Sequence, residues 1–552
     1  MSVIRSITRD LLGSLTRNII VETIASAAAA ILDSLQTESN GMVLHFESDT
    51  ALVRDTGTPA NDYNDSFNTE AADFLTYTSP SPKMVLQADG TLKYAAHNLY
   101  LNSGIPATQN ITVVSGHPYK LIVTGTTSIT VSGAGTGTAT AGSPVTFSAG
   151  TTTATLTLNS GTGTAQFFKT PASETYLETT GSARYALPIE YDSAGVSKGV
   201  LSEPAATNLI PVSNDLTDVA WTEGGLTITT DNAVGPSGNI DFDRLEITDT
   251  TNEFHGIYDQ VVFSTATDYT LSSVVKSDEQ QYVSLLLRGT SEHFVWANFD
   301  IQNGALADTQ VGDISGTIAG TSIEALGNGF YRISLTGQVS TAPSPIQVVS
   351  FHNAAEPVLG SFGVQDYVGV GGDGLWLGDI QFELGSVPTS YIPTYGSTVT
   401  RARDDLSLAA AAWPYSDTAG SIIVKTTILD DASLIRVFQL YKDSSNYIEV
   451  RPSSTAQFNI YDTGVFQAAL QPGPSSVGTE FTIAGSWAAN DFASSIDGSA
   501  VATDVSGTVP SGLTALWFGR KSSTASYHGH LKYFKYLPRA IEDAELITDT
   551  TA

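Results

Sequence analysis

The sequence predicts a mainly β protein of tandem jelly-roll or β-sandwich modules, preceded by one N-terminal α-helix. Thr, Ser and Gly take the place of charged residues, since Asp, Glu, Lys and Arg make up only 15% of the chain and glycines number 49. β-Branched Thr packs well on a pleated surface, and Gly supplies the positive-φ corners between short strands. Short runs with period-two alternation recur after residue 41, and 552 residues exceed one hydrophobic core.

The charge balance limits the classes of partner. Asp and Glu outnumber Lys and Arg by 56 to 25, which gives a formal net charge of −31. Such a surface repels phosphate backbones and anionic headgroups, so we expect neither nucleic acid binding nor membrane insertion. Carboxylate oxygens in loops make calcium a candidate ligand, and no other cofactor is indicated. The chain has no cysteine, which excludes disulfides and cysteine-based metal sites and suits assembly in a reducing cytoplasm.

The first 40 residues have a helical period. Apolar residues recur there at intervals of mostly three or four: Ile4, Ile7, Leu11, Leu15, Ile20, Ile24, Ile31 and Leu35. This amphipathic pattern predicts a helix, and no comparably strong helix follows that could cover its apolar stripe. We expect the helix to serve in anchoring or oligomerisation, with packing on its own β-domain as the alternative.

An internal repeat follows an irregular β segment at 41–97. The same residue types recur at matching offsets near the two ends of each copy: Asn98, Ser103, Gln166, Phe167, Tyr176 and Thr179 in the first, and Asn208, Ser213, Gln381, Phe382, Tyr391 and Thr394 in the second. We interpret 98–184 and 208–401 as a short and a long version of one β-sandwich, joined by a linker at 185–207. The shared motifs are expected on their first and last strands.

The last module spans 402–552. Its strand-like runs begin at Ser421, Leu434 and Tyr447, about a dozen residues apart, and further runs begin at Phe481 and Ala515. This spacing is typical of an antiparallel two-sheet sandwich with short turns.

Several motifs resemble known modules. Residues 327–332, 376–385 and 388–394 resemble the closing part of carbohydrate-binding-like jelly rolls in phage tail and fibre proteins. Residues 486–498 and 529–546 resemble a concanavalin/laminin-G-like domain of phage structural proteins. Together with weaker similarities, the resemblance covers roughly residues 75–552.

The resemblance implies a bacteriophage virion structural protein of tail or fibre type, located in the virion after assembly in the host cytoplasm. We expect it to form a homotrimer, to contact other virion proteins and to bind a host-surface glycan. Two alternatives are an architectural capsid or neck fibre without a ligand, and a surface-polysaccharide depolymerase.

Sugar recognition needs exposed aromatic faces, which stack on the C–H surfaces of pyranoses. The candidates for this role are Trp221, Trp296, Trp413 and Tyr527. Three other tryptophans lie within apolar strand runs and are expected in the core: Trp376, Trp487 and Trp517.

We expect no enzymatic activity. Glycoside hydrolysis needs two carboxylates that face each other across a cleft, and no strand carries the Glu-x-Asp-x-x-Glu pattern of concanavalin-like glucanases. His528 and His530 lie on one face of a predicted strand, where two imidazoles could chelate a metal, but no third ligand is indicated.

Overall fold

The computed structural model confirms a mainly β protein, with 54% of the chain in strands and 2% in helix. It describes residues 41–47, 50–54, 76–78, 81–213, 215–289, 293–312, 316–339, 346–360, 362–409, 415–430, 435–519 and 527–551. The predicted N-terminal helix and its apolar stripe lie outside these residues. One helix is described, α3 (Asp543–Thr551). No helix in the described part of the chain is long and apolar enough to span a membrane.

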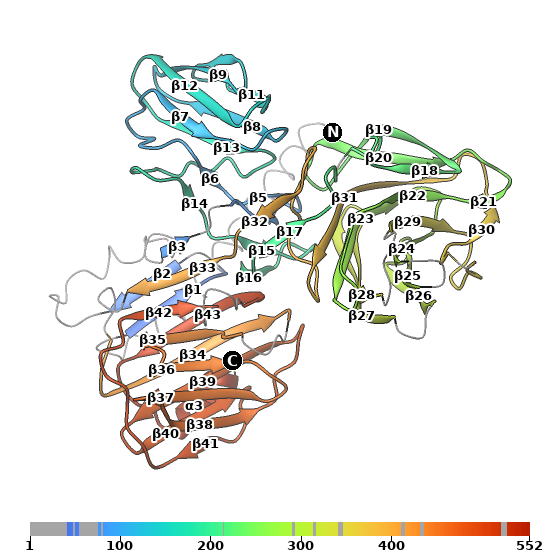
Figure 1. Ribbon diagram of the computed structural model, residues 1–552. Coiled ribbons are helices and arrows are strands. Elements are labelled where there is room, and N and C mark those ends of the chain that lie inside the picture. Colours follow the sequence, from blue (N-terminus) through green and yellow to red (C-terminus); the bar gives the residue numbers. More distant parts are fainter. Residues whose placement is uncertain are drawn as a thin grey trace, which may run out of the picture.

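The described part of the chain forms three β-sandwiches, and the first is the smallest (Figure 1). Its two sheets have the strand orders β10 (Gly137–Ala139), β9 (Ser128–Gly133), β12 (Thr153–Ser160), β7 (Gln109–Thr112), and β11 (Val145–Ser148), β8 (Pro118–Val123), β13 (Ala165–Lys169). Period-two alternation turns Tyr119, Leu121 and Val123 of β8 inward. Tyr119 stacks on Phe167 with the ring centroids 5.3 Å apart, so aromatic packing joins neighbouring strands of this core.

The second sandwich has two six-stranded sheets. One has the order β18 (Thr222–Gly224), β22 (Gly256–Asp259), β29 (Ile346–His352), β24 (Tyr282–Arg288), β25 (Phe294–Asp300), β26 (Ala305–Val311). The other has the order β19 (Leu226–Val234), β20 (Ile240–Ile247), β31 (Gly374–Leu384), β23 (Tyr269–Ser277), β28 (Phe330–Gln338), β27 (Thr317–Gly327). A separate pair, β21 (Asn252–Phe254) with β30 (Asp366–Val368), adds to its edge.

The first sandwich reproduces the centre of the second. The order β10-β9-β12-β7 matches β25-β24-β29-β22, and β11-β8-β13 matches β28-β23-β31, with the same sequence order along the chain. Tyr269 and Phe382 stack at 5.2 Å on the strands that correspond to those of Tyr119 and Phe167. The two copies interpreted from the sequence as variants of one sandwich therefore share the strand topology of their central sheets.

The third sandwich is assembled from separated parts of the chain. Its larger sheet has the order β15 (Ile189–Tyr191), β16 (Ser197–Ser202), β43 (Gly529–Leu537), β34 (Ala419–Ile428), β39 (Glu480–Ala488), β40 (Asp491–Ile496), β41 (Ala502–Asp504); β1 (Gly41–His45) also pairs with β43, and β2 (Thr50–Arg54) with β1. The facing sheet has the order β3 (Thr76–Thr78), β33 (Asp405–Ala409), β42 (Ala515–Phe518), β35 (Phe438–Asp443), β36 (Asn446–Arg451), β37 (Ala456–Asp462), β38 (Val465–Gly473).

These pairings change the roles predicted for two segments. The segment 41–97, expected to be irregular, supplies β1, β2 and β3 to the third sandwich and forms the hairpin β4 (Met84–Leu86) and β5 (Leu92–Tyr94). The expected linker 185–207 supplies β15 and β16. The first two sandwiches are therefore insertions into the third, and Figure 1 shows the blue strands β1 to β3 beside its orange and red strands. Local sequence does not reveal such long-range partners.

Each inserted sandwich is closed by a short ribbon at its base. β6 (His97–Asn98) pairs with β14 (Arg184–Tyr185), and β17 (Ala206–Asn208) pairs with β32 (Val399–Arg401). The repeated asparagine of each opening strand is fully buried, and its side chain bonds to the backbone of both closing segments. Asn208 Nδ2 donates to the carbonyls of Ile380 (3.1 Å) and Ile392 (3.0 Å), as Asn98 Nδ2 does to Ala165 and Leu177.

The other repeated residues complete this motif. Ser213 Oγ lies 2.7 Å from the Tyr391 hydroxyl, and Thr394 Oγ1 donates to the carbonyl of Ile210 at 2.8 Å. Ser103 with Tyr176, and Thr179 with the carbonyl of Tyr100, make the same contacts in the first sandwich. The repeat detected in the sequence is thus a hydrogen-bonded closure of each insertion.

We expect Asn208→Ala to lower the free energy of unfolding by about 2–4 kcal/mol, because several buried backbone groups lose their partner. Asn98→Ala should act in the same direction on the first sandwich. Denaturant unfolding followed by tryptophan fluorescence and by circular dichroism measures the change. The exposed Asn110→Ala is the matched control and should stay within about 0.5 kcal/mol of the parent protein. An Asn208→Ala protein as stable as this control would contradict a structural role for the closure.

Candidate functional site

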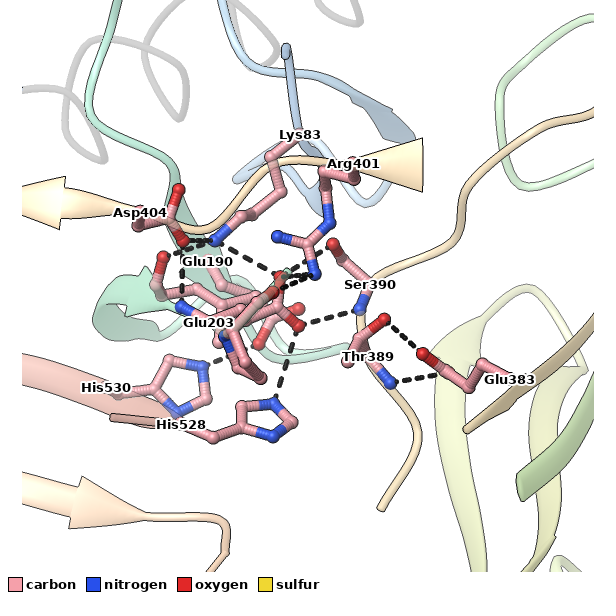
Figure 2. A network of polar contacts seen from close by, with 12 residues as sticks. Lys83, Glu190, Glu203, Glu383, Thr389, Ser390, Arg401, Asp404, His528 and His530 are labelled. Atoms are coloured by element: carbon pink, nitrogen blue, oxygen red, sulfur yellow. Dashed lines mark hydrogen bonds and ion pairs between the residues drawn. The ribbon is translucent and has the colours of Figure 1, made fainter. Parts of the chain in front are cut away.

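A buried network of charges lies where the second and third sandwiches meet (Figure 2). At its centre Glu203, which follows β16, is 1% exposed. Its Oε2 lies 3.1 Å from Lys83 Nζ and 3.3 Å from Arg401 Nη2, and its Oε1 lies 3.4 Å from His528 Nε2. Ser390 also donates to this carboxylate, from its backbone N and its Oγ, both at 2.7 Å.

A second carboxylate completes the network. Asp404 accepts from Lys83 Nζ, from the backbone N of Glu203 at 2.8 Å and from the Tyr77 hydroxyl at 2.9 Å. Burial alone would raise the pKa of Glu203, but Arg401, Lys83 and His528 outweigh it and hold that pKa well below its usual value. The surrounding cations thus favour the ionised form of Glu203, which suits a structural role at this junction.

The two histidines considered as metal ligands belong to this junction. His528 contacts Glu203, and His530 Nε2 lies 2.7 Å from Glu190 Oε2. Burial raises the pKa of Glu190, but its hydrogen bond to His530 and the nearby Lys198 lower it to about 2. Among the described residues, no group of three or more His, Cys, Asp or Glu side chains is placed to hold a metal ion. Each imidazole thus has a carboxylate partner of its own.

The outer face of the seven-stranded sheet of the third sandwich carries a row of aromatic side chains. Ile448 and Val450 of β36 enter the core, so alternation places Tyr447 and Glu449 on the opposite face. The row crosses five neighbouring strands: Trp517 on β42, Tyr441 on β35, Tyr447 on β36, Tyr461 on β37 and Phe466 on β38. We call this set the aromatic row.

Ring contacts divide the aromatic row into two groups, which the register of β35 and β36 places side by side. Tyr441 stacks on Trp517 with centroids 4.5 Å apart, and Tyr447 stacks on Tyr461 at 4.4 Å. Phe466 lies 3.9 Å from Tyr461 and is half exposed, while the other four rings are partly exposed. Cross-strand pairing fixes the positions of Tyr441, Tyr447, Tyr461 and Phe466 side by side.

A polar row lies next to it on the same face. Gln439, Glu449 and Asn459 are cross-strand neighbours on β35, β36 and β37, and each is at most 2% exposed. Glu449 accepts from Arg436 Nε, from Gln439 Nε2 at 3.2 Å and from Asn459 Nδ2 at 3.4 Å. This network fixes the part of the sheet face next to the aromatic row, and it leaves the Gln439 Oε1 without a partner among the described residues.

The residues predicted to face a glycan are placed elsewhere. Trp221 is 7% exposed and its Nε1 donates to the carbonyl of Val212 at 2.9 Å. Trp296 is fully buried in a small apolar cluster on β25, and Tyr527 is fully buried with its hydroxyl bonded to the carbonyl of Thr427 at 2.9 Å. The prediction is wrong for these three, because each ring is covered: Trp221 and Tyr527 lie in sandwich cores, and Trp296 lies in a separate apolar cluster on the other face of its strand. Trp413 lies outside the described residues.

The aromatic row was not predicted from the sequence, because one of its rings was expected to be buried. Trp517 stands in an apolar run and was expected in the core together with Trp487 and Trp376. Trp487 is indeed fully buried, whereas Trp376 is partly exposed and its Nε1 donates to Asn232 Oδ1. The usable signal was the alternation in Tyr447-Ile448-Glu449-Val450, where aromatic and charged residues share one face of the strand.

Comparison with known proteins gives no family assignment, since no family model and no curated protein match the chain. Several solved structures match the chain in part. Domain 4 of an extracellular arabinanase from Geobacillus stearothermophilus, in complex with arabinotriose, has 12% identity and a TM-score of 0.24, and the match covers 30% of this chain and 82% of that one.

Two further structures match larger parts of the chain. Mouse laminin α1 domains LG4-5 match at 10% identity and TM-score 0.19, over 53% of this chain and 90% of that one. A tandem CBM22 domain from Paenibacillus barcinonensis matches at 10% identity and TM-score 0.20, over 56% and 93%. TM-scores this low do not establish a shared fold, so the fold class is assigned from the strand pairing described above.

Because the junction contains ionised carboxylates, the free energy of unfolding should decrease at acidic pH. Because the folded pKa of Glu190 is below its unfolded value of about 4.3, its contribution is complete above that pH and is lost as the pH falls toward 2. The stability gap between wild type and Glu190→Gln should therefore narrow by on the order of 1 kcal/mol from pH 6 to pH 3. Urea unfolding at both pH values tests this, with the exposed Glu253→Gln as control. A gap that does not change with pH would refute the role of Glu190.

Proposed function

We propose that the protein binds a glycan on the outer face of the third sandwich. The observation that carries this proposal is the aromatic row, in which five rings lie side by side on one sheet face. Aromatic faces stack on the C–H surfaces of sugar rings, and tyrosine adds a hydroxyl for hydrogen bonding. Rings held across five paired strands are preorganised, which reduces the entropy lost on binding.

The arrangement favours binding over hydrolysis. A glycosidase needs two carboxylates, one of them free to donate a proton. The polar row contains one carboxylate, Glu449, and Arg436, Gln439 and Asn459 all bind it. We therefore propose a lectin-like role without catalysis.

The wider role that we propose is that of a bacteriophage virion structural protein of tail or fibre type. This part of the proposal is supported by the sequence motifs at 327–332, 376–394 and 486–498 that resemble modules of such proteins. In that role the protein would form a homotrimer, contact other virion proteins through residues 1–37 and present its sandwiches to the host surface. Because the two smaller sandwiches are inserted into the third, one chain would present several surfaces for binding.

Removing rings from the centre of the aromatic row should weaken glycan binding. We expect the double variant Tyr447→Ala and Tyr461→Ala to bind host cells or a glycan array at least roughly tenfold more weakly, since each stacked aromatic contributes about 0.5–1.5 kcal/mol beyond its buried area. The full-length protein is used, because strands from all parts of the chain build this sandwich.

The control is Phe362→Ala, which removes a half-exposed ring from the second sandwich. Unchanged binding by the double variant, with an unchanged melting temperature, would disprove the aromatic row as the site. Release of new reducing ends from a bound polysaccharide, lost in Glu449→Gln, would replace the lectin-like role with a depolymerase.

Deletion of residues 1–37 should convert a trimer to a monomer and prevent incorporation into particles. The reason is the apolar stripe predicted for this segment, which needs a partner surface. Mass photometry of the purified protein and complementation of a phage that lacks the gene measure the two effects. A deleted protein that stays trimeric and is incorporated normally would contradict this part of the proposal.

A further inference from the structure

A separate cavity of about 320 Å³ lies between the first sandwich, the closing segment of the second and the β4–β5 hairpin. The first sandwich approaches the second closely beside it, because a Cβ on Gly116 would lie 2.5 Å from the carbonyl oxygen of Tyr395. His117 also packs edge-to-face on Tyr395 with centroids 4.7 Å apart. The two sandwiches are thus held in contact next to the cavity, which is large enough for a monosaccharide.

Four tyrosines and two cations contribute to the cavity wall: Tyr94, Tyr119, Tyr185, Tyr391, Lys169 and Arg401. Of the described residues that line it, none is Asp or Glu. This is unusual in a chain of net charge −31, in which acidic residues outnumber basic ones more than twofold. The cavity therefore differs in charge from the rest of the protein.

Both cations retain unused hydrogen-bond donors. Lys169 is the last residue of β13, and its backbone N donates to His97 Nε2 at 2.9 Å, but no acceptor or carboxylate among the described residues contacts its Nζ. Arg401 is 2% exposed; its Nη2 reaches Glu203 and the carbonyl of Pro204, while its Nε and Nη1 are buried without a partner in the described chain.

Such groups are costly to bury unless an anion accompanies them. Lys169 is partly buried, and this burial without a counter-charge lowers its pKa to about 8, because the ammonium loses part of its hydration. The junction shows how the same fold treats other buried cations, since Lys83 has both Glu203 and Asp404 as partners. A bound carboxylate would give Lys169 the partner that the protein itself does not provide.

We propose that this cavity binds a carboxylate-bearing sugar of monosaccharide size, such as a uronic acid residue. The carboxylate pairs with the ammonium of Lys169 and the free donors of Arg401, and tyrosine rings contact the sugar ring. The hydroxyls of Ser81 and Thr112 are further hydrogen-bond partners on the wall. This site is distinct from the aromatic row, so the two proposed sites can be tested independently of each other.

Titration calorimetry of the full-length protein with sodium D-glucuronate tests the proposal, with D-glucose as the neutral match. We expect glucuronate to bind and glucose to bind at least roughly tenfold more weakly, as a charged hydrogen bond is lost. Lys169→Met should weaken glucuronate binding to the same degree while keeping its aliphatic stem in place. Thr112→Trp, at an exposed position of the wall, should block the cavity without changing its charge.

Lys120→Met is the matched control, since Lys120 lies on the neighbouring strand β8 and pairs with the exposed Glu174 at 2.5 Å. It should bind glucuronate as the parent protein does. The proposal is overturned if the parent protein does not bind glucuronate, if glucose binds equally well, or if Lys169→Met and Thr112→Trp bind like the control. Circular dichroism of each variant verifies that the sandwiches remain folded.

Discussion

The arrangement of the sandwiches depends on the ion pairs and hydrogen bonds of the Glu203 carboxylate. This carboxylate contacts Lys83, which precedes β4, Ser390 and Arg401 from the end of the second sandwich, and His528 from the third. Removing one member of such a buried group would leave an uncompensated charge, at a cost of about 3–5 kcal/mol. Because its members come from distant parts of the sequence, the network forms only when the insertions are closed and docked.

Nesting explains why each insertion needs its own closure. A sandwich inserted into another must begin and end at nearly the same point, so its first and last strands have to meet. The buried asparagines Asn98 and Asn208 meet this requirement by bonding to both closing segments, and the Ser–Tyr and Thr–carbonyl contacts lock the ribbon beside them. The length of chain between the closures is then free to vary, which allows one copy to have seven central strands and the other to add more.

The two proposed binding sites arise at different levels of this architecture. The aromatic row belongs to a single sheet, where cross-strand register alone brings Tyr441, Tyr447 and Tyr461 together. The cavity with Lys169 and Arg401 exists only because separate sandwiches are held against each other. A neutral stacking surface and a positively charged cavity on one chain suit different parts of a heterogeneous polysaccharide.

The sequence by itself determined the fold class and the repeat. Period-two alternation identifies strands without tertiary information, and the fixed offsets of Asn208, Ser213 and Tyr391 record a local bonding pattern that each copy repeats. Tertiary structure decided which strands pair across the insertions, as when β1 joins β43 almost 500 residues later. It also decided which aromatic rings are covered. Alternation separates the two faces of a strand, but only packing decides which side chains are covered. Trp296 lies on the face of β25 opposite to the core residues Val295 and Ala297 and is still buried in a separate apolar cluster, while Trp517 belongs to the aromatic row.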